Sequence, residues 1–129
     1  MLNQALYPDN YRKIGESFVS EFYNVLRTDR SQLQHFYHDQ ARMTYEGQEI
    51  LGKQKIGEKF QSLPARQIAV ALTSCDVHPG ENSILIHVLG QLKCDEDPAL
   101  SFCELFFLRK FNNCFLVTDS TFRLHLHNF

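Results

Sequence analysis

The sequence lacks several features that would each point to a class of protein. No run of about 18 apolar residues is present, so we expect no membrane-spanning segment. The first residues, MLNQALYPDNYRK, lack the basic and apolar regions of a secretory signal, so we expect a reducing compartment and free thiols. A net charge of -2 provides no basic field for nucleic-acid phosphates, and we therefore expect no nucleic-acid partner.

Metal and cofactor motifs are also missing. The four cysteines, at positions 75, 94, 103 and 114, contain no C-x-x-C pair, which argues against a zinc or redox site. His125 and His127 share one face of the last segment, but no further ligand stands at metal-binding spacing, so we expect no metal. Neither G-x-x-x-x-G-K-[ST] nor G-x-G-x-x-G occurs, so the sequence predicts no cofactor and no directly bound nucleotide.

The residues that are present suit one folded domain over residues 1–129. The hydrophobic content is 43% and the charged content 22%, which is typical of a globular protein. Aromatic content rests largely on 11 Phe, because Trp is absent. We expect part of this aromatic load to fill the core and the rest to line an interface or a pocket.

Helical spacing dominates the first half of the chain. Apolar residues from Tyr11 to Leu26 recur at helical intervals, with Asp9 as the expected cap and Thr28–Arg30 as the end. A short helix is predicted over Ser31–Tyr37 with Ser31 as its N-cap, and a third over Lys53–Leu63, stopped by the following proline.

The second half is rich in β-branched and aromatic residues and predicts four long strands. They span residues 67–77, 83–94, 100–111 and 114–126. His78–Gly80 and Asn112–Asn113 are the expected turns, and a short β segment runs from Arg42 to Tyr45. Helices followed by antiparallel strands predict the α+β class, with a strongly bent antiparallel sheet wrapped around the long N-terminal helix.

Both faces of the strand over residues 101–111 are largely apolar. Phe102, Glu104 and Phe106 share one face, and Cys103 and Leu105 share the other. One face is expected to pack on the helices. The other needs a different cover, and a second copy of the chain is the simplest one, so we expect a homodimer.

Two polar segments stand out as a candidate binding site. Three consecutive acids, Asp95–Asp97, follow a strand and precede a proline, so we expect them on an exposed strand end. In the segment TYEGQ, Tyr45 and Glu46 are neighbours on an extended chain and point to opposite sides, so an aromatic ring faces a cavity while an acid faces its rim. Phe122 on the last strand is expected at the same cavity. An apolar pocket with an acidic rim suits an aromatic side chain flanked by Lys or Arg.

The segments GQLKCDEDP (90–98), TYEGQ (44–48) and FRLHLHNF (122–129), in this order and spacing, closely resemble the nuclear transport factor 2 family. The resemblance runs from about Tyr11 to Phe129 and implies the family's cystatin-like cone. It implies a carrier of Ran-GDP, in which a Phe of the partner's switch II segment enters the cavity while rim acids pair with neighbouring basic residues. The implied rim residues are Glu46, Asp95 and Asp97. The implied cavity residues are Tyr45, Leu63, Ile68, Leu92, Leu100 and Phe122.

The resemblance also implies a second binding surface and a location. In the family, the position of Tyr11 helps to bind Phe-Gly repeats of nuclear pore proteins, and the protein moves between cytoplasm and nucleus, concentrated at the nuclear envelope. The best-known members carry Trp at the positions of Tyr11 and Tyr45, so both sites here have a smaller ring with a hydroxyl group.

Other readings of the same residues stay open. The acids of residues 95–97 are also typical of a solvated loop. Tyr45 and Phe122 could be ordinary core residues, and Glu46 before Gly47 could simply form a turn. A non-catalytic scaffold subunit of an mRNA export factor has the same fold, as do cavity enzymes such as ketosteroid isomerases and dehydratases. An enzyme needs an acid or His inside the cavity. Glu104 and His87 are the best candidates, but we expect both at a subunit interface or on an exposed sheet face, and we expect no catalytic activity.

Overall fold

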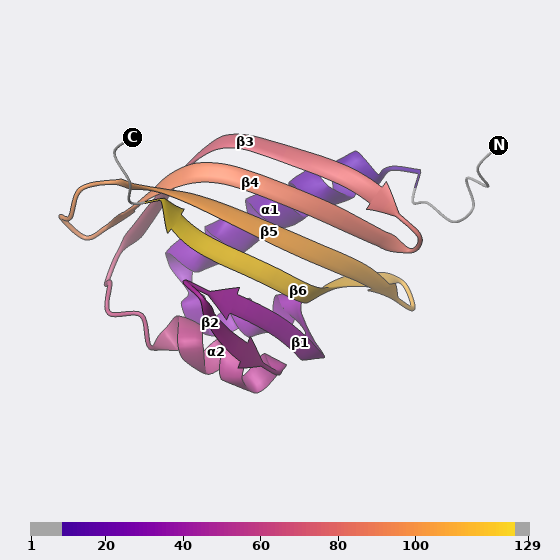
Figure 1. The fold of residues 1–129 in the computed structure, drawn as a ribbon, viewed down its shortest axis with the longest axis horizontal. Coiled ribbons are helices and arrows are strands. Elements are labelled where there is room, and N and C mark those ends of the chain that lie inside the picture. The colour runs from indigo at the N-terminus through magenta and orange to yellow at the C-terminus, as the bar shows by residue number, and fades with distance from the viewer. Residues whose placement is uncertain (1–8, 126–129) are drawn as a thin grey trace.

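The computed structural model describes residues 9–125, which form three helical segments and six strands (Figure 1). The helical segments are α1 (Tyr11–Thr28), the 3-10 helix η2 (Arg30–Phe36) and α2 (Lys53–Gln61). The strands are β1 (Tyr37–Tyr45), β2 (Gln48–Leu51), β3 (Ile68–Gly80), β4 (Ser83–Cys94), β5 (Leu100–Phe111) and β6 (Cys114–His125). Within residues 9–125, no helix has the length and apolar character needed to span a membrane.

The strands form one bent sheet in the order β2-β1-β6-β5-β4-β3, with α1 running across one face (Figure 1). The predicted α+β class, with a bent sheet around the N-terminal helix, is confirmed. One pairing differs from the expected antiparallel pattern, because β1 lies parallel to β6. A parallel pair needs a long crossover between its strands, and here the whole chain from β2 to β5 provides it.

The core lies between α1 and the inner face of the sheet. Phe18 and Phe22 of α1 contact Phe106 of β5, with ring centroids 5.0 and 4.9 Å apart, and Phe106 has no exposed surface. Helix and sheet approach closely where Gly15 faces Val77, since a Cβ atom at Gly15 would lie 2.6 Å from a Val77 methyl group. Glycine at this position therefore lets the helix lie against β3.

Several predicted boundaries were wrong for local reasons. Asn10, not Asp9, is the N-cap of α1, and Asp29 rather than Ser31 caps η2, because the Asp29 side chain accepts the Ser31 amide. The expected turn at residues 78–80 is instead the end of β3, and the chain reverses at residues 81–82. Proline at position 79 is tolerated there because β3 is an edge strand, where a missing N–H donor breaks no ladder.

The other boundaries match more closely. The hairpin turn at residues 112–113 is confirmed, with Asn112 in the left-handed region at a φ of 57°. The third predicted helix ends two residues early, at Gln61. The last strand is described as far as His125, and the rest of its predicted span lies outside the described residues.

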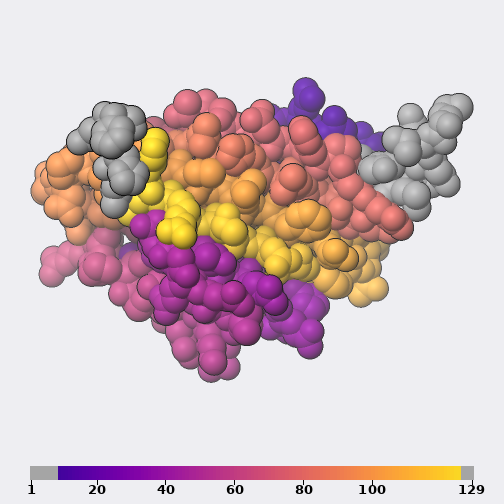
Figure 2. All heavy atoms as spheres, viewed as in Figure 1, coloured from indigo at the N-terminus to yellow at the C-terminus, as the bar shows by residue number. Residues whose placement is uncertain are grey.

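The outer face of the sheet is not covered by α1, which lies on the opposite side (Figure 1). Side chains of β3 to β6 form this face in the space-filling view (Figure 2). Leu85 and Leu89 are 39% and 40% exposed, and Leu105 and Phe107 beside them are half-buried. The apolar second face predicted for β5 therefore borders none of the helices within residues 9–125 (Figure 1).

Candidate functional site: a cavity between the helix and the sheet

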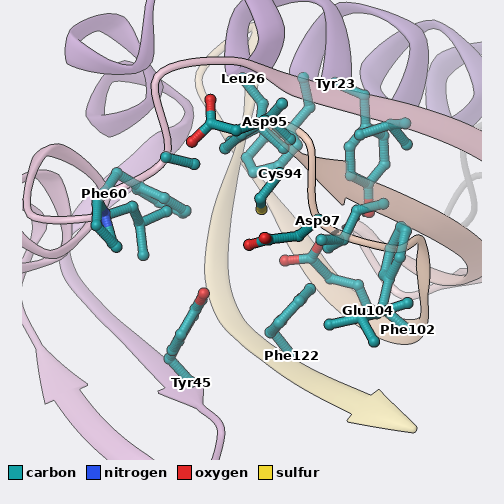
Figure 3. Close-up of a pocket in the computed structure, with 18 of the residues that line it drawn as sticks. Tyr23, Leu26, Tyr45, Phe60, Cys94, Asp95, Asp97, Phe102, Glu104 and Phe122 are labelled. Carbon is teal, nitrogen blue, oxygen red and sulfur yellow. Dashed lines mark hydrogen bonds between the residues drawn. The ribbon is translucent and has the colours of Figure 1, made fainter. Parts of the chain in front are cut away.

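A cavity of about 400 Å³ opens between the C-terminal half of α1 and one end of the sheet (Figure 3). Its walls come from α1, α2 and all strands except β2. The lining residues are mostly apolar, with few polar side chains: Phe22, Tyr23, Leu26, Tyr45, Phe60, Leu63, Pro64, Ala65, Ile68, Val70, Leu92, Cys94, Asp95, Asp97, Pro98, Leu100, Phe102, Glu104 and Phe122. A cavity of this size and lining has the character of a site for an apolar group.

The two aromatic residues proposed for the cavity lie in its wall and stack on each other. The rings of Tyr45 and Phe122 have centroids 4.9 Å apart and an interplanar angle of 13°. The parallel pairing of β1 with β6 sets this contact, because it places Tyr45 directly beside Phe122. The four aliphatic residues predicted at the cavity, Leu63, Ile68, Leu92 and Leu100, also line it.

Two predicted rim acids, Asp95 and Asp97, lie at the cavity in the loop between β4 and β5 (Figure 3). Both are exposed. The Asp95 carboxylate accepts the backbone N–H groups of Arg66 and Gln67, the latter at 2.9 Å, which fastens the loop to the start of β3. Burial, followed by the nearby charges of Asp95 and Asp97, raises the pKa of the Cys94 thiol. The loop is thus fixed in place and negatively charged.

Glu46 occupies a different position from the other two acids. It forms a two-residue turn with Gly47 between β1 and β2, both in the left-handed region at φ of 49° and 85°. Its carboxylate accepts the backbone N–H of Leu124 on β6. Glu46 is exposed and is not among the described residues that line the cavity. It follows Tyr45 directly, so it stands next to the cavity wall and also holds the turn against β6.

Tyr11 stands at the other end of α1. It is the first residue of the helix, is half-buried and packs against the core. Along the helix axis it lies about 18 Å from Tyr23, which lines the cavity. Any surface around Tyr11 is therefore separate from the cavity. Of the two terminal histidines considered as ligands, His127 lies outside the described residues, and residues 9–125 contain no cluster of potential metal ligands.

The predicted location of Glu104 was wrong. It was expected at an interface or an exposed sheet face, and the cavity was expected to be lined only by apolar and aromatic groups. Instead, Glu104 lines the cavity and is 4% exposed, and its Oε1 accepts a hydrogen bond of 2.6 Å from the Tyr23 hydroxyl. The signal was present, because Glu104 alternates with Phe102 and Phe106, which face the core.

Burial changes the protonation of this carboxyl group. It raises the pKa of Glu104 to about 8, and the hydrogen bond from Tyr23 offsets part of the shift. Burial also raises the pKa of Tyr23, Tyr37 and Tyr45, with the charge of Glu104 as a second cause for each. At neutral pH the carboxyl group of Glu104 is therefore mostly protonated, and the surrounding phenols are neutral.

His87, the second candidate for cavity chemistry, lies elsewhere. It is half-buried on the outer face, where its Nε2 is 3.2 Å from the Sγ of Cys103, and it is not among the described residues that line the cavity. The cavity therefore holds one buried acid and, within residues 9–125, no His, Lys or Arg in its lining.

Comparisons with known proteins agree on one family. A sequence model described as the nuclear transport factor 2 (NTF2) domain matches residues 14–124. The probable nuclear transport factor 2 of Caenorhabditis elegans is 36% identical over 94% of this chain and 96% of its own length.

Solved structures give the same picture. Nuclear transport factor 2 from Cryptosporidium parvum is 28% identical, with a TM-score of 0.88 over 97% of this chain and 100% of that chain. The yeast UBP3-associated protein BRE5 is 26% identical, with a TM-score of 0.82 over 92% of this chain and 98% of that chain. The chain is similar to these proteins along nearly its full length.

Proposed function

This chain belongs to the nuclear transport factor 2 family, and we propose that it acts in nuclear transport as a non-enzymatic carrier of Ran-GDP. In this proposal an aromatic side chain of Ran-GDP enters the cavity, and basic residues beside it pair with acids at the rim. Release follows when the partner exchanges GDP for GTP, because the contacting segment is arranged differently in the two states.

The observation that carries the proposal is an apolar cavity with exposed acids at its edge. Its volume of about 400 Å³ accommodates one aromatic side chain, and the stacked rings of Tyr45 and Phe122 form one wall. Asp95 and Asp97 supply negative charge at the edge, with Glu46 next to the wall at Tyr45. Apolar burial in such a pocket provides the anchor, and exposed charge raises the association rate and sets orientation.

Two further contacts complete the proposed carrier. Weak binding of Phe-Gly repeats around Tyr11 allows passage through the pore, and the separation of Tyr11 from the cavity lets both partners bind together. A homodimer covers the outer sheet face, where Leu85 and Leu89 are exposed. On this proposal the protein moves between cytoplasm and nucleus and concentrates at nuclear pores.

The test is calorimetric titration of the purified protein with Ran loaded with GDP and, in parallel, with GTP. We expect binding to the GDP form alone. Saturable binding to both forms contradicts nucleotide discrimination, and binding to neither contradicts the carrier function. Chemical-shift mapping in the same complex should show changes at Tyr45, Asp97 and Phe122.

An alternative is a non-catalytic scaffold subunit, such as that of an mRNA export factor. The likeness to BRE5, which is described as a UBP3-associated protein, favours considering it. A scaffold of this kind pairs through the outer sheet face with a different chain. Light scattering of the isolated protein distinguishes the two functions. A carrier should be a homodimer, whereas the scaffold subunit would pair with a different chain.

A further inference from the structure

The polar groups deep in the cavity have no role in the carrier function proposed above. Tyr23 on α1 and Glu104 on β5, here called the inner polar pair, are 6% and 4% exposed and both line the cavity (Figure 3). A Phe side chain of a protein partner has no group that could form a hydrogen bond with them. A buried carboxyl group that borders a cavity without serving the occupant is costly, because one hydrogen bond from Tyr23 compensates only part of its desolvation.

The carboxyl group of Glu104 has one oxygen free to bond an occupant. Its Oε1 accepts the Tyr23 hydroxyl at 2.6 Å, whereas Oε2 has no hydrogen-bond partner within residues 9–125. The two other hydroxyl-bearing residues nearby from β1, Tyr37 and Tyr45, make no hydrogen bond to it either. Once the carboxyl group is ionised, an occupant that donates to Oε2 would complete the pairing of this buried group.

Within residues 9–125, the carboxyl groups at the cavity are not balanced by basic side chains in its lining. Glu104, Asp95 and Asp97 line it, and no Lys, Arg or His does so within the described part of the chain. Two basic side chains lie outside: Lys59 of α2 stands 4.9 Å from the ring of Tyr45, and Arg30 bonds the backbone carbonyls of Leu63 and Ala65. Apolar walls with acids as the ionisable polar groups suit a cation on an apolar body.

We propose that the cavity binds small organic cations, namely primary ammonium groups on an aromatic body, with the ammonium group held by Glu104 and the ring by Tyr45 and Phe122. This site does not rest on the carrier function, since no protein partner takes part. Binding couples to a proton: the Glu104 carboxyl group releases its proton to solvent, and the resulting carboxylate pairs with the ammonium ion, which keeps its own three protons.

This proton release sets the pH dependence. Because the free carboxyl group has a pKa of about 8, affinity should rise about tenfold per pH unit below that value and then level off. The other titratable groups facing Glu104 are Tyr23 from α1, Tyr37 and Tyr45 from β1, and Cys94, Asp95 and Asp97 at the end of β4. Burial raises the pKa of the three phenols and of Cys94, so only the proton of Glu104 leaves in this window.

The probe is tryptamine, and its matched neutral analogue is tryptophol, in which a hydroxyl group replaces the amine. Titration followed by protein NMR, at about pH 6 to about pH 9, gives both affinities in the wild-type protein, in Glu104→Gln and in the control Glu81→Gln. Gln keeps the shape of Glu104 and its acceptor for Tyr23. Glu81 is an exposed acid at the turn between β3 and β4 and does not line the cavity.

We expect the wild-type protein and Glu81→Gln to bind tryptamine at least about tenfold more tightly than tryptophol near pH 8, with the pH slope described above. Glu104→Gln should lose the slope and most of the preference. In the wild-type protein, the carboxyl carbon of Glu104 should shift toward its ionised position when tryptamine binds, which tests the site even if the variant folds poorly.

Three outcomes would overturn the proposal: equal affinity for the amine and the alcohol, a preference unchanged in Glu104→Gln, or no saturable binding of tryptamine. None of them depends on Ran, so the carrier function can fail while this site stands, and the reverse. Where both hold, tryptamine should compete with Ran-GDP for the same cavity.

Discussion

The inner face of β5 passes through two different environments. Phe106 and Leu108 lie in a close-packed interior, 0% and 1% exposed, with Phe106 held between Phe18 and Phe22 of α1. Two residues earlier on the same face, Glu104 borders the cavity. The difference arises from the helix, because Phe side chains fill the space over Phe106 while Tyr23 and the residues after it only line the space beyond. The inward-facing residues of one strand therefore form part of the packed core at one end and part of the cavity wall at the other.

The largest expected effects come from truncating one Phe side chain in each environment and comparing the two losses of stability. Phe106→Ala should lower the free energy of unfolding by about 4 kcal/mol, because it leaves a dry hole among packed rings. Phe122→Ala should lower it by about 3 kcal/mol, since the new space joins an existing cavity, and it should also abolish Ran-GDP binding. Denaturant titration and calorimetry check this. An equal loss of stability for both variants would contradict the contrast.

The buried acid makes the cavity half of the sheet sensitive to pH. Unfolded Glu104 loses its proton near the ordinary pKa of 4.5, whereas folded Glu104 keeps it up to about 8. Between these values the folded state binds one more proton, so its stability should fall by about 1.4 kcal/mol per pH unit as the pH rises. Below 4.5 this contribution is fully present, and above 8 it is lost.

Glu104→Gln removes that dependence. The difference in unfolding free energy between this variant and the wild-type protein, measured by denaturant titration across this window, should therefore grow in favour of Gln as the pH rises. A constant difference would show that the folded carboxyl group titrates normally and that the cavity is more hydrated than its lining suggests.

Reversal of charge at the cavity edge should affect binding more than stability. Glu46→Lys should prevent Ran-GDP binding and lower the free energy of unfolding by about 1 kcal/mol, because the carboxylate also accepts the Leu124 amide. Glu81→Lys, at the exposed turn between β3 and β4, changes the same charge away from the cavity and serves as the control. Retained binding in Glu46→Lys would remove this residue from the rim.

A substitution at the start of α1 should have a smaller effect, limited to binding of Phe-Gly repeats. Tyr11→Ala should weaken binding of a Phe-Gly repeat peptide and leave Ran-GDP binding unchanged, because the cavity lies about 18 Å away along the helix. Parallel titrations with both ligands measure this. Loss of both activities would mean that Tyr11 only supports the fold.

A substitution on the outer face of the sheet should change the fold of the single chain least. Leu89→Arg places a charge where Leu89 is 40% exposed, so circular dichroism of the variant should match the wild-type spectrum. Light scattering should show a monomer in place of the expected dimer, since the charge would be buried between subunits. A dimer of unchanged affinity would place the subunit contact elsewhere.

The sequence by itself determined the α+β class, the long first helix and the main strands. These follow from periodicity and turn chemistry, which are local: Asn112 favours its hairpin because it tolerates a left-handed backbone. Strand alternation suggested Tyr45 and Phe122 at a cavity, and the resemblance of three segments to a known family added Leu63, Ile68, Leu92 and Leu100 to its lining.

Only the tertiary structure decided how the strands are ordered and what each polar group faces. The parallel pairing of β1 with β6 stacks Tyr45 on Phe122, and no local pattern specifies a pairing between segments so far apart. Alternation placed Glu104 on the face shared with Phe102 and Phe106, but not opposite Tyr23 or beside a cavity. The position of Glu104 beside the cavity depends on where the side chains of α1 stop covering the inner face of the sheet. The environment of a buried ionisable group is set by every element packed around it.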